Sequence, residues 1–236
     1  MASGDDQTHL VQFNYPAGTH GNIRVSGAIS DGTAGGSLSL VVNGGTVTLT
    51  ATNTYSGFTE IDGGTLLING NNSGASGRVY AYNGGTLGGT GTIGSTVYTY
   101  GGTITGATAT TVGQLTLQGD VHISTGEGDG IYLANLSGSL SDLLAITGTL
   151  FLGGESQLNI VGTPDGTTTY TLATFAAHNG TFSILPSGIP SGYTLVYNAT
   201  DLELVPTAIP EASTWIGAAL ALGAVGFATR RKLRRA

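Results

Sequence analysis

The tripeptide Gly-Gly-Thr recurs through the first half of the chain and constrains the fold more than any other feature. Its threonines are Thr46, Thr65, Thr86 and Thr103. They recur with a period of about 20 residues, which is typical of solenoid proteins, in which each repeat forms one coil and buries its apolar side only by stacking on the next coil. The repeat therefore predicts a stack of short coils.

The residues that follow each glycine pair alternate between apolar and small polar side chains, as at Val47 and Leu49 or at Leu66 and Ile68. A period of two indicates a strand with one buried face. Glycine pairs suit the corners between strands, because glycine adopts positive φ without strain. We therefore predict all-β coils from residue 38 to residue 160. The same alternation predicts that the following residues point inward: Leu115, Leu117, Val121, Ile123, Leu150, Leu152, Leu158 and Ile160.

A second repeat carries tyrosines. The sequence Val-Tyr-Ala-Tyr at 79–82 returns as Val-Tyr-Thr-Tyr at 97–100. If this offset is one coil, Tyr80 lies above Tyr98 and Tyr82 lies above Tyr100, at a spacing of about 4.8 Å. Facing outward, such rings could bind a glycan. The alternative, which we favour, is a ladder of rings that only stabilises the coils.

The pattern changes after residue 160, where longer alternating segments are separated by Pro-Asp-Gly and Pro-Ser-Gly turns. We interpret residues 161–206 as a capping β-region, because an uncovered coil end would expose unpaired backbone and apolar side chains. Residues 1–37 are less regular, and we interpret them as an irregular N-terminal segment or a partial first coil.

Charge is distributed unevenly. The net charge is −7, and five of the seven basic residues lie within the last seven positions. Residues 1–208 carry thirteen acidic residues against only Arg24 and Arg78. Nucleic-acid binding is therefore excluded, because neutralising phosphates requires clustered lysine and arginine. The chain has no cysteine, which excludes thiolate catalysis and cysteine-ligated metals.

The segment NTYSGFTEIDGGTLLINGNNSGASGRVYAYNGGTLGGTGTIG, residues 53–94, resembles the autotransporter-associated β-strand repeat of bacterial surface proteins. That pattern is approximately Asn-Thr-Tyr-Ser/Thr-Gly-Gly-Thr, followed by Gly-Gly-Thr-Leu. Residues 53–57 and Thr59 match it, and Phe58 stands where the second glycine is usual. The resemblance implies a right-handed parallel β-helix passenger, and it implies no enzyme activity.

Residues 207–236 end the chain with an apolar run and an arginine cluster. The run from Trp215 to Ala228 is uncharged, and it can be extended at most to residues 212–229. Because about 20 residues cross a bilayer comfortably, this length suits a thin or tilted membrane span. The basic cluster behind it would remain in the cytoplasm and leave the body of the protein outside. We therefore predict a single C-terminal hydrophobic helix.

This tail resembles the PEP-CTERM sorting domain, which an exosortase processes in bacteria with envelopes rich in exopolysaccharide. The second proline of the motif is replaced by Ala212, and the matching residues are Pro210, Glu211, Ser213, Thr214, Trp215, Arg230 and Arg231. The resemblance implies that the tail anchors the protein transiently in the inner membrane, with the membrane, an exosortase-type sorting enzyme and an exopolysaccharide as partners. An ordinary tail anchor is the alternative.

Candidate catalytic residues are few. Some parallel β-helices are polysaccharide lyases or hydrolases, and Glu60 and Asp62 have the i, i+2 spacing that places two carboxylates on one strand face. Solvated acidic residues are the interpretation that we favour. The four histidines, His9, His20, His122 and His178, lack the spacing of metal ligands. We therefore expect no catalytic residue, no metal and no cofactor.

These observations favour a non-catalytic, exported bacterial surface or extracellular-matrix protein that contributes to the envelope, to biofilm or to adhesion. The alternatives are a carbohydrate-binding module that uses the tyrosines and, with less support, a polysaccharide-active enzyme. The amino terminus has neither the basic nor the apolar region of a secretion signal. If the protein is exported, we expect the given start to be incomplete or misplaced.

Overall fold

The computed structural model describes residues 8–15, 21–32, 35–124 and 128–207. Within these residues the protein is all-β, with twenty-one strands and no helix. The predicted all-β class is confirmed. The expected C-terminal helix and the sorting residues at 210–215 and 230–231 lie outside the described residues. Among the residues that are described, no helix has the length and apolarity needed to traverse a bilayer.

The strands follow one another with short connections. They are β1 (His9–Phe13), β2 (Asn22–Val25), β3 (Leu38–Leu49), β4 (Thr59–Ile68), β5 (Asn71–Asn72), β6 (Val79–Tyr82), β7 (Gly85–Gly88), β8 (Thr92–Ile93), β9 (Val97–Tyr100), β10 (Thr103–Thr105), β11 (Gln114–Leu117), β12 (Val121–Ile123), β13 (Ile131–Gly138), β14 (Leu140–Ser141), β15 (Leu143–Ile146), β16 (Thr149–Leu152), β17 (Gln157–Pro164), β18 (Tyr170–Thr174), β19 (Ala177–Asn179), β20 (Tyr193–Tyr197) and β21 (Asp201–Pro206).

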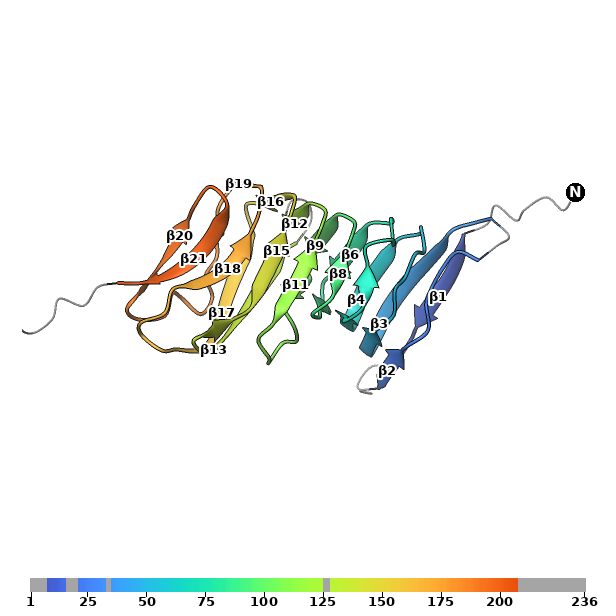
Figure 1. Ribbon diagram of the computed structural model, residues 1–236, viewed down its shortest axis with the longest axis horizontal. Coiled ribbons are helices and arrows are strands. Elements are labelled where there is room, and N and C mark those ends of the chain that lie inside the picture. Colours follow the sequence, from blue (N-terminus) through green and yellow to red (C-terminus); the bar gives the residue numbers. More distant parts are fainter. Residues whose placement is uncertain (1–7, 16–20, 33–34, 125–127, 208–236) are drawn as a thin grey trace, which may run out of the picture.

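Most strands pair in parallel, and the pairs form three ladders along the elongated molecule (Figure 1). The first ladder contains β2, β3, β4, β7, β10, β13 and β17. The second contains β1, β3, β4, β6, β9, β12, β16 and β19. The third contains β5, β8, β11, β15 and β18. From β6 onward the chain passes through the second, first and third ladders in a constant order, and we call one such passage a coil.

The repeating threonines occupy equivalent positions in successive coils. Thr46 pairs with Thr65, Thr65 with Thr86, and Thr86 with Thr103. The sequence spacing therefore predicted the register correctly. The glycine pair before each threonine bends the chain between the second and first ladders. At Gly64, for example, φ is +69°, and a Cβ atom would lie 2.4 Å from the carbonyl oxygen of Gly45 in the preceding coil.

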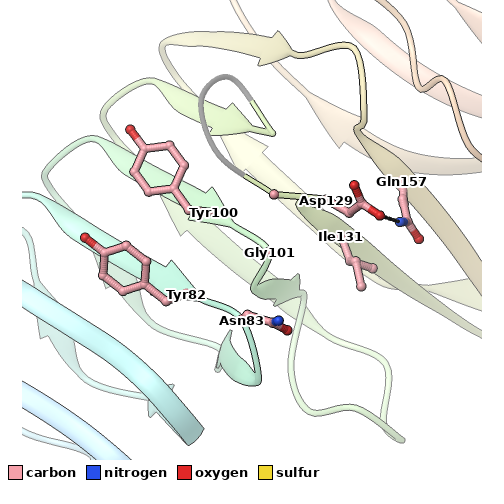
Figure 2. Close-up of a pocket in the computed structure, with 8 residues that line it drawn as sticks. Tyr82, Asn83, Tyr100, Gly101, Asp129, Ile131 and Gln157 are labelled. Carbon is pink, nitrogen blue, oxygen red and sulfur yellow. Dashed lines mark hydrogen bonds between the residues drawn. The ribbon is translucent and has the colours of Figure 1, made fainter.

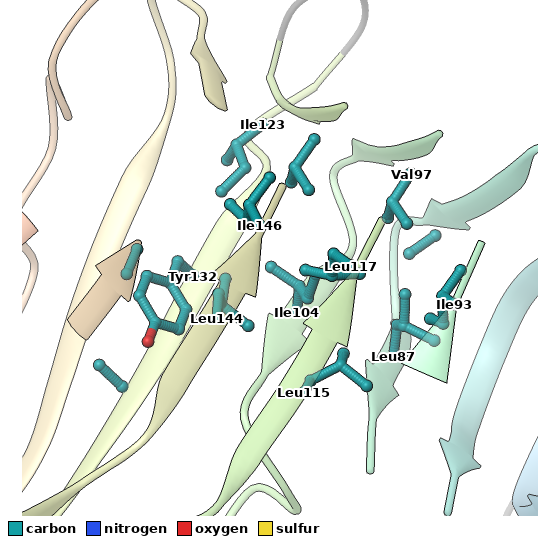
Figure 3. Packing of buried hydrophobic residues seen from close by; sticks show 14 of the residues in the cluster. Leu87, Ile93, Val97, Ile104, Leu115, Leu117, Ile123, Tyr132, Leu144 and Ile146 are labelled. Atoms are coloured by element: carbon teal, nitrogen blue, oxygen red, sulfur yellow. The ribbon is translucent and has the colours of Figure 1, made fainter. Parts of the chain in front are cut away.

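The apolar residues that point inward form one continuous core. All eight residues predicted to face inward between residues 115 and 160 are buried. Figure 3 shows part of this core, in which Ile104 of β10, Leu117 of β11 and Ile123 of β12 come from the three different ladders. Each ladder thus contributes one row of side chains to a shared interior, and each coil depends on its neighbours for burial.

The two ends of the stack differ. At one end, β18, β21 and β20 pair antiparallel at the end of the third ladder, so the sheets are mixed (Figure 1). The side chains of Leu202 and Leu204, on the central strand β21 of this antiparallel group, are fully buried. At the other end, β1 and β2 pair in parallel with the two halves of β3.

Replacing a glycine at a coil-to-coil contact will destabilise the fold. A Cβ atom at Gly77 would lie 1.9 Å from the carbonyl oxygen of Gly57, so the coils would have to separate locally. We expect Gly77→Ala to lower the free energy of unfolding, measured in urea, by about 2 kcal/mol or more. The matched control is Gly154→Ala, whose Cβ atom would meet nothing within 4 Å. Equal effects of the two substitutions would contradict this packing.

Candidate functional site

Asn53 and Tyr55 of the Asn-Thr-Tyr motif are buried, whereas Thr54 between them is exposed. The side chain of Asn53 accepts a hydrogen bond from the Ile29 backbone N–H at 2.8 Å and donates one to Oδ1 of Asn72 at 2.7 Å. The Tyr55 hydroxyl lies 2.7 Å from Oγ1 of Thr59. The side chains of the two asparagines, the tyrosine and the threonine are all buried. These four buried side chains therefore stabilise a corner of the coil and are not available to a ligand.

The tyrosines of the second repeat lie on the outer face of the second ladder. Tyr80 pairs with Tyr98 and Tyr82 pairs with Tyr100 in a parallel register, as the offset between the two copies predicted. The residues that alternate with them, such as Ala81, are buried, whereas the four tyrosines are half-buried. The rings of Tyr80 and Tyr98 are stacked, with centroids 5.5 Å apart and planes 20° apart.

Two further rings, which the sequence reasoning missed, extend this stack. The His122 ring lies 4.5 Å from the Tyr98 ring, and the Phe151 ring lies 4.4 Å from His122, with interplanar angles of 15° and 10°. The alternation of side chains along β12 and β16 could have indicated that His122 and Phe151 face outward. The coils that lead to His122 and Phe151 are longer than the coil that separates the two tyrosine repeats. The sequence offset between the tyrosine repeats therefore does not predict that these two rings join the stack. We call Tyr80, Tyr98, His122 and Phe151 the aromatic column.

Stacking decides which parts of these rings meet solvent. Within the aromatic column each ring packs its face on the next ring, and the Arg78 guanidinium lies 5.7 Å from the centroid of the Tyr98 ring. Nearly parallel rings at this separation attract one another, and a cation near a ring face adds to the stability. The column therefore exposes mainly ring edges, and this geometry favours the interpretation that it stabilises the coils.

The two acidic residues considered for catalysis lie beside the column. Glu60 pairs with Tyr80 in the register between β4 and β6, and Asp62 follows on the same face of β4. Glu60 is half-buried and Asp62 is exposed. Burial raises the pKa of the Glu60 carboxyl group, and the charge of Asp62 adds to this effect. The structure thus places both carboxylates on the outer face, next to the tyrosines.

A groove adjoins the tyrosines at the bend between the second and first ladders (Figure 2). Its volume is about 910 Å³. Gln157 donates a hydrogen bond from Nε2 to Oδ2 of Asp129 at 2.9 Å across its lining. The groove is lined by Tyr82, Asn83, Tyr100, Gly101, Gly128, Asp129, Ile131 and Gln157. Glu60, Asp62 and the aromatic column do not line it. The sequence reasoning thus found Tyr82 and Tyr100 but missed Asn83 and Gln157.

One carboxylate is buried elsewhere. Asp142 is fully buried and accepts hydrogen bonds from Oγ1 of Thr105, from the Gly113 backbone N–H and from both the backbone and the side-chain N–H groups of Asn135. These bonds join two successive coils, because Thr105 and Gly113 lie in the coil of β9, β10 and β11, and Asn135 and Asp142 lie in the next coil. Because both carboxylate oxygens are occupied by protein donors, Asp142 has a structural role.

The described residues contain no group of three histidine, cysteine, aspartate or glutamate side chains arranged to hold a metal ion. His122 belongs to the aromatic column, and His178 contacts the rings of Phe175 and Tyr197 near the far end of the second ladder. His9 lies on β1. His20 lies outside the described residues. The structure thus places the three histidines that it describes away from the groove.

Comparison with known proteins gives a partial similarity. No protein-family model matches the chain. Over 98 residues, or 41% of this chain, the sequence is 42% identical to the adhesin BmaC autotransporter of Brucella suis biovar 1 (strain 1330). The match covers 2% of the length of that relative, so the chain spans only a small part of the protein that it resembles. The similarity agrees with the resemblance of the repeats to those of autotransporter proteins.

The aromatic column predicts a stability effect at its centre. Tyr98→Ala removes the ring between Tyr80 and His122, so we expect the free energy of unfolding to fall by about 2 kcal/mol. Tyr98→Phe keeps the ring and is the control, with an expected change within about 0.5 kcal/mol. Urea unfolding of the two variants measures the difference. A similar loss in both would show that the hydroxyl group, and not stacking, stabilises this position.

The column also predicts a dependence on pH. Burial lowers the pKa of the His122 imidazole below its ordinary value of 6.5, opposed by Asp120 and assisted by Arg78. The unfolded chain therefore binds a proton at this residue before the folded protein does. We expect the free energy of unfolding to decrease as the pH falls below about 6.5.

The measurement compares urea unfolding of the wild type with His122→Phe, which keeps a ring but cannot titrate. As the pH falls from about 7.5 to about 5.5, the free energy of unfolding of the wild type should decrease relative to that of His122→Phe. A difference that stays constant over this range would contradict the assignment to His122.

Proposed function

We propose that this chain is a non-catalytic, exported bacterial surface or extracellular-matrix protein. In this proposal its body is a right-handed parallel β-helix passenger, delivered by a C-terminal sorting signal, that has a structural and adhesive role in the envelope or in biofilm. The observation that carries the proposal is the parallel register between equivalent residues of successive coils, above all at Thr46, Thr65, Thr86 and Thr103.

The register supports a β-helix for a topological reason. Parallel neighbours cannot be joined by a tight hairpin, so the chain must travel around and return before it pairs with itself again. Here it returns by way of the other two ladders, and the enclosed space is filled by one apolar core. A rod of this kind displays a long side surface, which suits a protein that spaces or attaches.

Adhesion is supported by the similarity to a protein whose name describes it as an autotransporter adhesin. A non-catalytic role is supported by the composition of the groove, where Asp129 is the single carboxylate among the described residues of the lining. Hydrolysis of a glycosidic bond generally requires two carboxylates on opposite sides of the scissile bond. Glu60 and Asp62 lie together on one strand face outside the groove, so the enzymatic alternative has less support.

Delivery is supported by the tail sequence. Its Pro-Glu pair, apolar run and arginine cluster resemble the PEP-CTERM sorting domain. In the proposed route, the apolar helix holds the chain in the inner membrane with the arginines in the cytoplasm. An exosortase-type enzyme then cleaves near Pro210 and Glu211 and transfers or releases the body, which meets the exopolysaccharide outside the cell.

Fractionation of a bacterium that encodes an exosortase tests this route. We expect the full chain to be processed to a shorter form that is found outside the inner membrane, and external protease to reach a tag inserted at Gly154. Pro210→Ala with Glu211→Ala should leave the unprocessed chain in the membrane fraction, because the recognition residues are lost.

The matched control carries Pro190→Ala with Glu155→Ala, which removes the same residue types from exposed or half-buried positions in the body. It should be processed like the wild type. Processing of the 210–211 variant at the wild-type level, or a body that remains in the cytoplasm, would overturn the proposed route.

A further inference from the structure

We propose that the groove beside Tyr82 and Tyr100 binds a neutral polysaccharide chain. This inference rests on the proposed function, because it names the ligand class through which the exported rod would adhere. It differs from a simple tyrosine platform, since the residues that would recognise the ligand are mainly the polar side chains beyond the rings, Asn83, Asp129 and Gln157 (Figure 2).

The groove is large enough and long enough for an extended chain. Its volume of about 910 Å³ lies within the range of about 300 to 1,000 Å³ that is common for ligand sites. Its lining comes from four successive coils, at Tyr82 on β6, Tyr100 on β9, Ile131 on β13 and Gln157 on β17. Three steps of about 4.8 Å give a length of about 14 Å along the rod, which accommodates a short run of sugar rings.

The side chains around the groove match the chemistry of a sugar. Asn83 and Gln157 each offer an amide donor and acceptor, and Asp129 offers a carboxylate acceptor. The apolar surface of Ile131 suits the C–H faces of a sugar ring. Asn83 and Asp129 are exposed, and the glycines at 101 and 128 carry no side chain that would fill the space.

Charge decides between a neutral and an acidic polysaccharide. Among the described residues of the lining there is no lysine or arginine, and the carboxylate of Asp129 would repel a uronate or a phosphate group. The two arginines of the body lie elsewhere. Arg78 is held beside the Tyr98 ring, and Arg24 lies on β2 at the N-terminal end of the stack. A polyanion would therefore enter the groove without a counter-charge, whereas a neutral chain meets hydrogen-bonding groups.

The aromatic column adjoins the groove without lining it, because the Tyr98 ring lies 5.7 Å from the Tyr100 ring and the Tyr80 ring lies 6.1 Å from the Tyr82 ring. Tyr80 and Tyr98 pack their faces against other rings, and neither lines the groove. Removing a ring of the column should therefore change stability more than binding. Removing polar side chains from the groove should change binding more than stability, because Asn83 is exposed and the Gln157 side chain hydrogen-bonds to Asp129 at the surface.

Calorimetric titration of the purified full chain tests the site. The probes are neutral oligosaccharides built from glucose, mannose or galactose and, for comparison, an oligogalacturonate of the same length. We expect at least one neutral probe to bind and the acidic probe to bind at least about tenfold more weakly. Asn83→Ala with Gln157→Ala should lower the affinity for the neutral probe by at least about tenfold, because one or two hydrogen bonds to the probe are lost.

The matched control is Asn22→Ala with Gln114→Ala, which removes the same residue types from exposed positions on β2 and β11. It should bind like the wild type, and the thermal midpoints of both double variants should agree with that of the wild type within about 3 °C. Three results would each overturn the inference: failure of every neutral probe to bind, equal binding of the acidic probe, or wild-type affinity in the groove variant.

The outcome is separable from that of the proposed function. Export and processing are measured by fractionation of cells and do not depend on a sugar. A chain that is exported and processed but binds no neutral probe would leave the proposed route intact and remove only this binding site.

Discussion

Parallel backbone hydrogen bonding between successive coils is the interaction on which the rest of the structure depends. It places each residue directly beside its equivalent in the next coil. A position that requires one kind of side chain therefore requires it again in the following coil. Inward positions become continuous apolar rows, and outward positions become columns of like residues. Only glycine fits where backbones approach most closely, as Gly77 does against the carbonyl of Gly57. The sequence repeat is thus a direct consequence of the pairing.

The same stacking explains how an acidic chain tolerates its charge. Several carboxylates accept hydrogen bonds from backbone N–H groups of a neighbouring segment. Asp31 bonds to Leu38 and Ser56, and Asp120 bonds to Thr149. Hydrogen bonds to the charged form lower the pKa of Asp31, with the Ser56 N–H as the largest cause. The acids at these positions therefore connect neighbouring segments of the chain.

Local patterns predicted much of this arrangement. The glycine pairs and the alternation after them indicated the all-β class, the threonine register and the inward residues, because each is a property of one short segment. The offset between the two tyrosine repeats also predicted the pairing of Tyr80 with Tyr98. His122 and Phe151 escaped the same reasoning, since the coils that carry them include longer loops. A period measured on the regular coils does not predict which residues stack after an insertion.

By itself, the sequence determined the repeat, the burial pattern and the acidic charge of residues 1–208, all of which follow from residue type and spacing. Only the tertiary structure decided that the tyrosine faces are occupied by other rings and that a groove lies beside them. It brings Asp129 within hydrogen-bonding distance of Gln157, 28 positions away along the chain. No local pattern encodes that contact, because it depends on how far each intervening loop carries the chain before the next coil begins.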